Sequence, residues 1–125
     1  MRTIDLDDIP SVALQVGCTR YSTGLTACLT AAIVVGTAYI LLDFSRVHEF
    51  PEGAILVTDQ TSPECTAAIE KAQAVITQRG GILCHAAIVC RDLNIPCVVG
   101  VRDVLSSIGQ GQTIAVCTAT GRVYY

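Results

Sequence analysis

The sequence predicts a single α/β domain with short strands and short helices. Its second half alternates apolar runs, typical of buried strands, with segments whose apolar residues recur every three or four positions, as in helices. Of the 125 residues, 51% are apolar and only 15% are charged, so the chain can form a hydrophobic core and is not typical of disorder. No internal repeat or low-complexity linker interrupts it, and we predict one domain over residues 1–125.

The first half is expected to contribute one long strand. Its predicted segments are a mixed start at 1–20, a turn or loop at 21–31, a buried strand at 32–42 and a polar loop at 43–53. The strand follows from β-branched residues, and the polar loop from Pro51 and Gly53. Asp5, Asp7 and Asp8 make an acidic start that we expect to be solvated.

The second half is expected to contain most of the regular structure. Its predicted elements are strands at 54–58, 74–77 and 97–101, helices at 63–72 and from His85 onward, a helical turn at 103–108, and a hairpin of 113–118 with 122–125. Ser62 can cap the first helix, Pro63 suits its first position, and Glu64 suits the positive end of its dipole. Pro96 is expected to end the second helix, and Asp103 to cap the helical turn.

Residues 25–42 carry no charge and are just long enough to span a membrane as a helix. Three threonines and Gly36 weaken that alternative, and the β-branched residues of its second half favour a strand. The start of the chain lacks the basic region and small-residue cleavage site of a signal peptide. We therefore expect no membrane-spanning helix.

Charge and cysteine content exclude several other classes of function. The net charge is −3 with no basic block, so we expect no nucleic acid or anionic membrane as partner. The seven cysteines lack C-x-x-C spacing, and with only two histidines they do not predict a metal site. Most stand inside apolar runs, as Cys90 and Cys97 do, so we interpret them as reduced core residues of a cytosolic protein.

Residues 80–100, GGILCHAAIVCRDLNIPCVVG, form the candidate functional segment. Gly80 and Gly81 leave the backbone free to turn, and His85 follows at the start of a predicted helix. The first-turn amides of a helix lack internal partners and can receive an anion. Imidazole is a competent nucleophile near neutral pH, so His85 is placed to hold a phosphoryl group.

The residues alone leave a second interpretation of His85 open, since a lone histidine near a helix start is often a cap or a packed side chain. Ala86 and Ala87 are expected to leave room beside it for a donor. The other histidine, His48, stands beside Glu49 in a polar segment and is interpreted as a surface residue.

The segment resembles the mobile, or swivelling, phosphohistidine domain of phosphoenolpyruvate synthases, pyruvate phosphate dikinases and enzyme I of the sugar phosphotransferase system. The shared motif consists of Gly80-Gly81, Cys84-His85-Ala86-Ala87, Ile88-Val89, Arg91, Ile95-Pro96 and Gly100. Further likeness lies in the segments 36–40, 53–57, 61–63, 74–77 and 111–124. Together these cover residues 24–125 and imply the family's fold, a swivelling β/β/α sandwich.

The resemblance implies that His85 accepts a phosphoryl group at one site and delivers it to a second. The residues implied to support the phosphate are Thr61, Gly81, Cys84, Ala86 and Arg91. Three of these have alternatives: Thr61 can merely shape its turn, Cys84 can be a small packing residue, and Arg91 can lie on a solvated face or pair with an acid. The dikinases and synthases usually carry a threonine two residues before the histidine, the target of their regulatory kinase. Leu83 stands there, so we expect no control by that route.

Complete enzymes of this family also need an ATP-grasp-type nucleotide domain or a phosphoenolpyruvate-binding barrel, each larger than this chain. We expect such domains or subunits as partners, holding ATP, phosphoenolpyruvate or pyruvate, and Mg²⁺, while this domain binds no cofactor itself. The chain is then part of a phosphotransferase that does not turn over alone, either as a stand-alone subunit or as an excised piece. The alternatives are a non-catalytic interaction module that retains the fold and a thiol sensor using Cys84 or Cys90.

Overall fold

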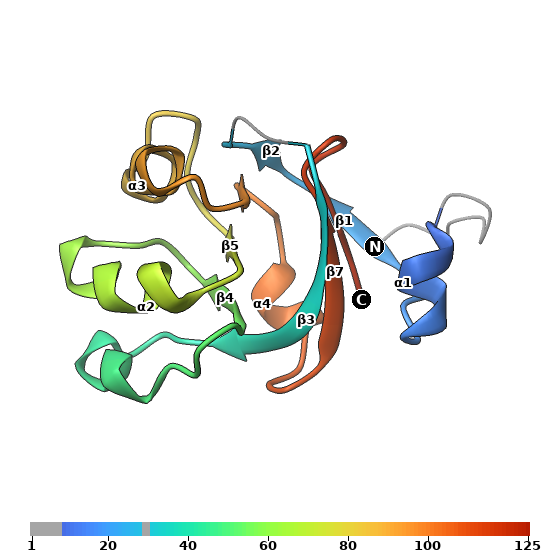
Figure 1. Cartoon of the computed structure of the whole chain (residues 1–125), viewed down its shortest axis with the longest axis horizontal. Helices are drawn as coiled ribbons and strands as arrows, with labels where there is room; N and C mark the ends of the chain where they lie inside the picture. The colour runs from blue at the N-terminus through green and yellow to red at the C-terminus, as the bar shows by residue number, and fades with distance from the viewer. Residues whose placement is uncertain (1–8, 29–30) are drawn as a thin grey trace.

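The computed structural model describes residues 9–28 and 31–125. Strand β3 (Ile33–Ile40) joins a parallel part and an antiparallel part of one sheet. The strand order is β1-β8-β7-β3-β4-β5-β6-β2. Strands β3 to β6 run parallel and form the parallel part, with β2 antiparallel at its edge. Strands β3, β7, β8 and β1 pair antiparallel and form the antiparallel part. The predicted α/β class is confirmed (Figure 1).

The other strands are short, and most match the predicted segments to within two residues. Their bounds are β1 Tyr21–Thr23, β2 Leu25–Thr26, β4 Ile55–Thr58, β5 Ala74–Thr77, β6 Cys97–Val99, β7 Thr113–Cys117 and β8 Arg122–Tyr124. The helices are α1 Ser11–Gln15, α2 Thr66–Lys71, α3 His85–Leu93 and α4 Val104–Ser107, with 3₁₀ helices η2 Phe44–Glu49 and η3 Pro63–Cys65. The acidic start at Asp5, Asp7 and Asp8 lies outside the described residues.

Side-chain alternation along the strands divides the interior into separate cores. Ile55 and Val57 of β4 pack with Ile114 of β7, between the two parts of the sheet. Leu56 points the other way, into a core shared with α2 and α3. On the far side, Ala13 of α1 packs against the antiparallel part. The layers therefore run from α2 and α3 through the two parts of the sheet to α1, as Figure 1 shows.

The prediction of a loop at residues 21–31 is wrong at 21–23 and 25–26, which form strands. Strand β1 pairs antiparallel with β8, and β2 pairs antiparallel with β6. Tyr21 stands opposite Tyr124, and Leu25 opposite Val99. Three-residue and two-residue strands show no local periodicity, so their pairing with distant strands defines them.

The prediction of a loop at residues 43–53 is corrected as well, because η2 occupies most of that segment. The Asp43 side chain accepts a hydrogen bond from the Ser45 amide (3.1 Å) and caps the start of η2. Two predicted caps are not observed, since neither Ser62 nor Asp103 makes a side-chain cap hydrogen bond. Pro63 does occupy the first position of η3.

Helix α3 ends at a left-handed residue, earlier than the predicted stop at Pro96. Asn94 has φ 55° and its amide bonds to the Arg91 carbonyl, which closes the last turn. Segment 33–40 of the uncharged run is a strand, and no helix within 9–28 and 31–125 is long and apolar enough to cross a membrane.

Candidate functional site

The predicted site residues gather at the carboxyl ends of the parallel strands. Beyond the ends of β4 and β5, the Gln78 amide still donates to the Thr58 carbonyl (2.9 Å). In the same way, the Val101 amide donates to the Thr77 carbonyl (3.0 Å). The three loops that follow β4, β5 and β6 are thus held side by side. Loops at this edge of a parallel sheet are the usual place for a binding site.

His85 is the first residue of α3, and its ring contacts the loop that follows β4. Nδ1 of His85 lies 2.7 Å from Oγ1 of Thr61, in a half-buried setting. A hydroxyl can accept from a protonated Nδ1 or donate to an unprotonated one. Because Nδ1 is engaged with Thr61, Nε2 is the ring nitrogen left for chemistry. The structure therefore brings two predicted site residues together and orients the imidazole.

An ion pair that the sequence analysis missed links the two loops that carry Thr61 and His85. Nε and Nη2 of Arg79 contact Oδ1 and Oδ2 of Asp59 at 2.9 and 2.5 Å. The Arg79 amide also donates to the Asp59 carbonyl at 2.9 Å. The hydrogen bond from Arg79 holds the pKa of the Asp59 carboxyl below its usual value. Neither residue has a local motif; only the parallel pairing of β4 with β5 predicts that they meet.

Gly80 is the member of the double glycine whose backbone requires glycine. Its φ is +129°, a value that side chains rarely adopt, and a Cβ there would lie 2.9 Å from Sγ of Cys84. A Cβ on Gly100 would in turn lie 2.9 Å from the Gly80 carbonyl oxygen. The loops after β5 and β6 thus touch backbone to backbone beside the start of α3.

Gly81, Ala86 and Ala87 are expected to lie beside the phosphate site, and the structure places the two alanines in the core instead. Gly81 has open space around it, and its carbonyl accepts from the Cys84 amide (3.0 Å). Ala86 and Ala87 are 1% and 0% exposed and pack in the core beneath α3. The prediction that they leave room for a donor is therefore corrected, because their small size lets α3 pack closely on the sheet.

Among residues 9–28 and 31–125, Arg91 pairs with no acid. Its Nη2 donates to the Ile82 carbonyl, so the side chain holds the loop that precedes His85 against α3. Cys84 is the N-cap residue of α3 but makes no side-chain cap hydrogen bond. Its sulfur instead packs beside Gly80, as a small packing residue does.

All seven cysteines are free thiols, and several of them line the core beneath α3. Burial raises the pKa of Cys65 to about 11. A hydrogen bond with Cys90, together with burial, raises the pKa of Cys97 far above its usual value. Thiols with such raised pKa values are poor nucleophiles, which disfavours a redox role for these core positions. Among the described residues, no cluster of three ligand side chains could hold a metal ion.

One buried polar atom lies beneath the loop after β5. Oγ1 of Thr77 has no hydrogen-bond partner in the described structure, and Thr77 is fully buried. The hydroxyl is 3.6 Å from the position of a Cβ built on Gly80. An unpartnered hydroxyl at this depth costs stability.

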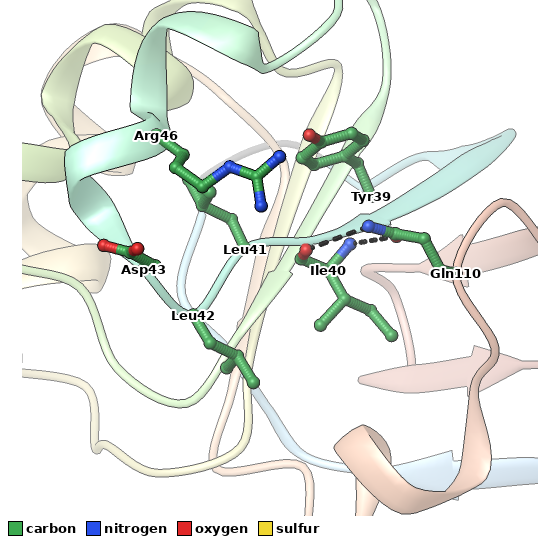
Figure 2. A pocket seen from close by; sticks show the side chains of 7 residues that line it. All are labelled: Tyr39, Ile40, Leu41, Leu42, Asp43, Arg46 and Gln110. Carbon is green, nitrogen blue, oxygen red and sulfur yellow. Dashed lines mark hydrogen bonds between the residues drawn. The ribbon is translucent and has the colours of Figure 1, made fainter.

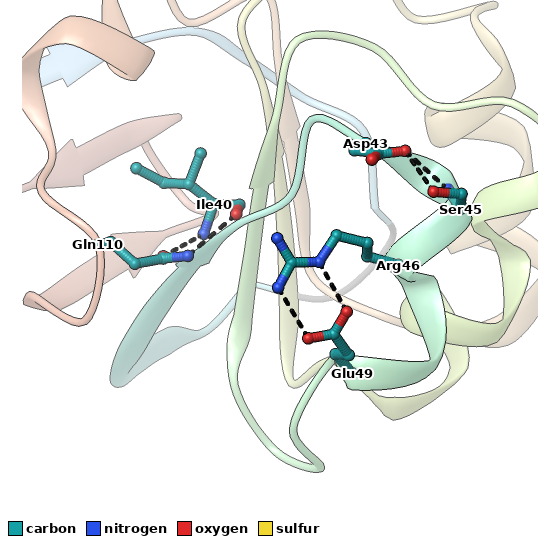
Figure 3. A network of polar contacts seen from close by, with 6 residues as sticks. All are labelled: Ile40, Asp43, Ser45, Arg46, Glu49 and Gln110. Atoms are coloured by element: carbon teal, nitrogen blue, oxygen red, sulfur yellow. Dashed lines mark hydrogen bonds and ion pairs between the residues drawn. The ribbon is translucent and has the colours of Figure 1, made fainter.

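A cavity of about 380 Å³ lies apart from the segments that hold His85. It is lined by Tyr39, Ile40, Leu41, Leu42, Asp43, Arg46 and Gln110 (Figure 2). The Gln110 side chain bonds to both the amide and the carbonyl of Ile40, as a neighbouring strand would. Arg46 is held by both carboxyl oxygens of Glu49 (Figure 3). The side chains of Asp43, Arg46 and Gln110 are thus engaged within the chain.

Comparison with known proteins shows the family of the chain. The family model of the PEP-utilising enzyme mobile domain matches residues 50–121, which include Thr61 and His85. The chain is 44% identical over 90 residues to a phosphoenolpyruvate synthase of Helicobacter pylori, and 39% identical over 93 residues to that of Escherichia coli. These matches cover 72% and 74% of this chain but only 11% and 12% of the relatives.

Solved structures with a similar fold are also found. The solution structure of an Enzyme I protein matches with a TM-score of 0.53 and 30% identity, over 62% of this chain and 32% of that one. Aconitase X of Thermococcus kodakaraensis matches with a TM-score of 0.61, over 84% of this chain and 97% of that one. At 16% identity, the second likeness concerns the fold alone.

Proposed function

Because the chain belongs to the family of phosphoenolpyruvate-utilising enzyme mobile domains, we propose that it is a phosphoryl carrier whose carrier residue is His85. The contact of 2.7 Å between Nδ1 of His85 and Oγ1 of Thr61 is the observation that carries this proposal. It fixes the ring and leaves Nε2 as the nucleophile. We also propose that the two facing parts of the sheet are the swivelling β/β/α sandwich that the resemblance implies.

The proposed transfer uses the tautomer with a proton on Nδ1, which donates to the Thr61 hydroxyl. The lone pair of Nε2 forms a bond to phosphorus while the donor's P–O bond breaks, and the leaving group departs with that electron pair. The ring then carries positive charge, which the hydrogen bond to Thr61 stabilises. The reverse sequence passes the phosphoryl group to an acceptor and restores the neutral ring.

The setting of His85 at the start of α3 supports the same role. The helix has nine residues, and the amides that precede Ile88, whose own amide bonds to the Cys84 carbonyl, have no helical carbonyl one turn earlier. Together with the dipole, they favour an anion at this end. Gly80 and Gly100 keep side chains away from the adjoining backbone. The phosphoryl group on Nε2 would therefore meet backbone amides at this end of the helix, with no side chain on the two adjoining glycines.

We expect the donor and acceptor sites to belong to other domains or subunits. The chain matches only 11% of the Helicobacter pylori relative, so most of that protein lies outside the matched part. The expected partners are a nucleotide-binding domain and a phosphoenolpyruvate- or pyruvate-binding domain, with ATP, phosphoenolpyruvate and Mg²⁺ bound there. The free thiols are consistent with action in the cytosol.

Intact-mass measurement at alkaline pH tests the proposal, because phosphohistidine is lost in acid. The chain is incubated in extract of its source cells with ATP or, separately, with phosphoenolpyruvate. We expect one added phosphoryl group on the wild type and none on a His85→Ala variant. No addition with either donor, in extract active for this chemistry, would instead favour an interaction module that retains the fold.

A further inference from the structure

Large exposed apolar residues lie on the loop before His85 and on the first turn of α3. Leu83 is 78% exposed, more than any other large apolar residue in the described part of the chain. Ile82 and Ile88 are 55% and 47% exposed. Exposed apolar residues that stand singly are ordinary, but a group of them around one reactive residue marks an interaction surface.

Local geometry places these three residues on the same surface as the histidine. Ile88 follows His85 by one helical turn, on the face of α3 that is not buried. Leu83 precedes the N-cap residue Cys84 directly, and the contact of Arg91 with the Ile82 carbonyl holds this loop against the helix. The loop and the first turn of α3 therefore form one continuous surface.

From this arrangement, we propose that Ile82, Leu83 and Ile88 form an apolar collar that docks on the rim of the partner site holding the phosphoryl donor. This inference rests on the proposed function. Transfer requires Nε2 to approach the donor phosphorus to about 3–3.5 Å. A partner that comes so close to a half-buried ring must also cover the side chains beside it. The occupant of the collar is thus the domain or subunit that carries the donor.

The charge of the segment suits this occupant. Residues 80–90 contain no Asp, Glu, Lys or Arg, although the chain as a whole carries a net charge of −3. A carboxylate in the collar would repel the phosphate oxygens of the donor, and a buried charge would need a partner. An apolar surface without a carboxylate avoids both costs and excludes water from the site of transfer. The Arg91 guanidinium at its edge is bonded to the Ile82 carbonyl.

The size of the collar fits a carrier that must leave again. Three side chains contribute far less area than a stable protein interface, so the contact should be weak and short-lived. A weak docking surface affects the affinity of the carrier for its partner more than it affects the rate of the chemical step. In kinetic terms, loss of the collar should raise KM for the carrier and leave kcat nearly unchanged.

The test compares Leu83→Ser and Ile88→Ser with a matched control, Leu14→Ser. Leu14 is 39% exposed on α1, on the opposite side of the sheet (Figure 1). Initial rates of phosphorylation are measured over a range of carrier concentrations, in source-cell extract with whichever of ATP and phosphoenolpyruvate labels the wild type. Phosphoramidate, a small donor that needs no protein, measures the reactivity of His85 separately.

We expect each collar variant to raise KM by about tenfold, a typical effect for a central interface residue. Phosphoramidate labelling and the Leu14→Ser control should match the wild type, and Leu83→Met should restore most of the lost rate. Unchanged KM in both collar variants overturns the docking proposal while the carrier role stands. A wild type that no partner donor labels overturns the carrier role first, and the docking proposal with it. Sedimentation showing a dimer that Leu83→Ser dissociates also overturns the proposal, because the collar then binds a second copy.

Discussion

Oγ1 of Thr61 lies 2.7 Å from Nδ1 of His85, although the two residues are 24 positions apart in the sequence. The contact exists because β4 and β5 pair in parallel, so the loops that follow them leave the sheet at the same edge. Phosphoryl transfer by His85 depends, in our account, on the orientation and tautomer that this hydroxyl imposes. The first prediction follows from that dependence.

Thr61→Val replaces the hydroxyl with a methyl group of nearly the same shape. Nδ1 of His85 then loses its partner, and the ring is free to rotate or change tautomer. We expect phosphorylation by phosphoramidate to slow by about tenfold, the equivalent of one hydrogen bond of ordinary strength. Thr61→Ser keeps the hydroxyl and should stay within about twofold of the wild type. Equal rates for Thr61→Val and the wild type would show that the contact only shapes the turn.

Gly80→Ala and Gly81→Ala form a matched pair in adjacent positions. The first puts a side chain at φ +129° and 2.9 Å from Sγ of Cys84, whereas the second points a methyl group into open space. We expect Gly80→Ala to lower the free energy of unfolding by about 1–3 kcal/mol. Gly81→Ala should change it by less than about 0.5 kcal/mol. Urea denaturation measures both, and similar values for the two variants would contradict the assignment of the strained turn to Gly80.

Thr77→Val tests the unpartnered hydroxyl beneath the loop after β5. The substitution removes a buried polar atom without changing the shape of the side chain. We expect the free energy of unfolding to rise by about 1 kcal/mol, since no hydrogen bond is lost. A clear loss of stability on thermal denaturation would indicate that the hydroxyl has a partner in solution.

The raised pKa of the Cys65 thiol should make the free energy of unfolding depend on pH. Its pKa is about 11 in the folded chain, against an ordinary value of 9.0, because burial disfavours the thiolate. The folded state holds this proton more tightly, so the contribution to stability is complete below pH 9 and is lost as the pH rises toward 11. We expect the free energy of unfolding to fall less steeply over this range in Cys65→Ala than in the wild type. Parallel slopes in denaturant titrations would contradict the assignment.

Much of the fold could be predicted from the sequence because its longer elements depend on local patterns. The start of α3 at His85 follows from apolar spacing, and β4, β5 and β7 are apolar runs between turns. The short strands β1 and β2 depend on pairing with β8 and β6, and no local pattern contains that information.

The site was predictable in part for the same reason. The position of His85 on a helix start is local, whereas the pairing of Asp59 with Arg79 depends on neighbouring strands. The inward position of Ala86 could have been anticipated, since helical spacing places it on the same face as Cys90. The contact of Arg91 with the Ile82 carbonyl could not, because a backbone oxygen in a loop leaves no trace in side-chain patterns.

The most direct test of the central claim is the site of the phosphoryl group on the histidine ring. The phosphorylated chain, labelled with ¹⁵N at histidine, is examined at alkaline pH by NMR that correlates phosphorus with the ring nitrogens. Our account predicts a single phosphoryl group on Nε2 of His85, with Nδ1 still protonated and bonded to Thr61. A phosphoryl group on Nδ1, or on any residue other than His85, would contradict it.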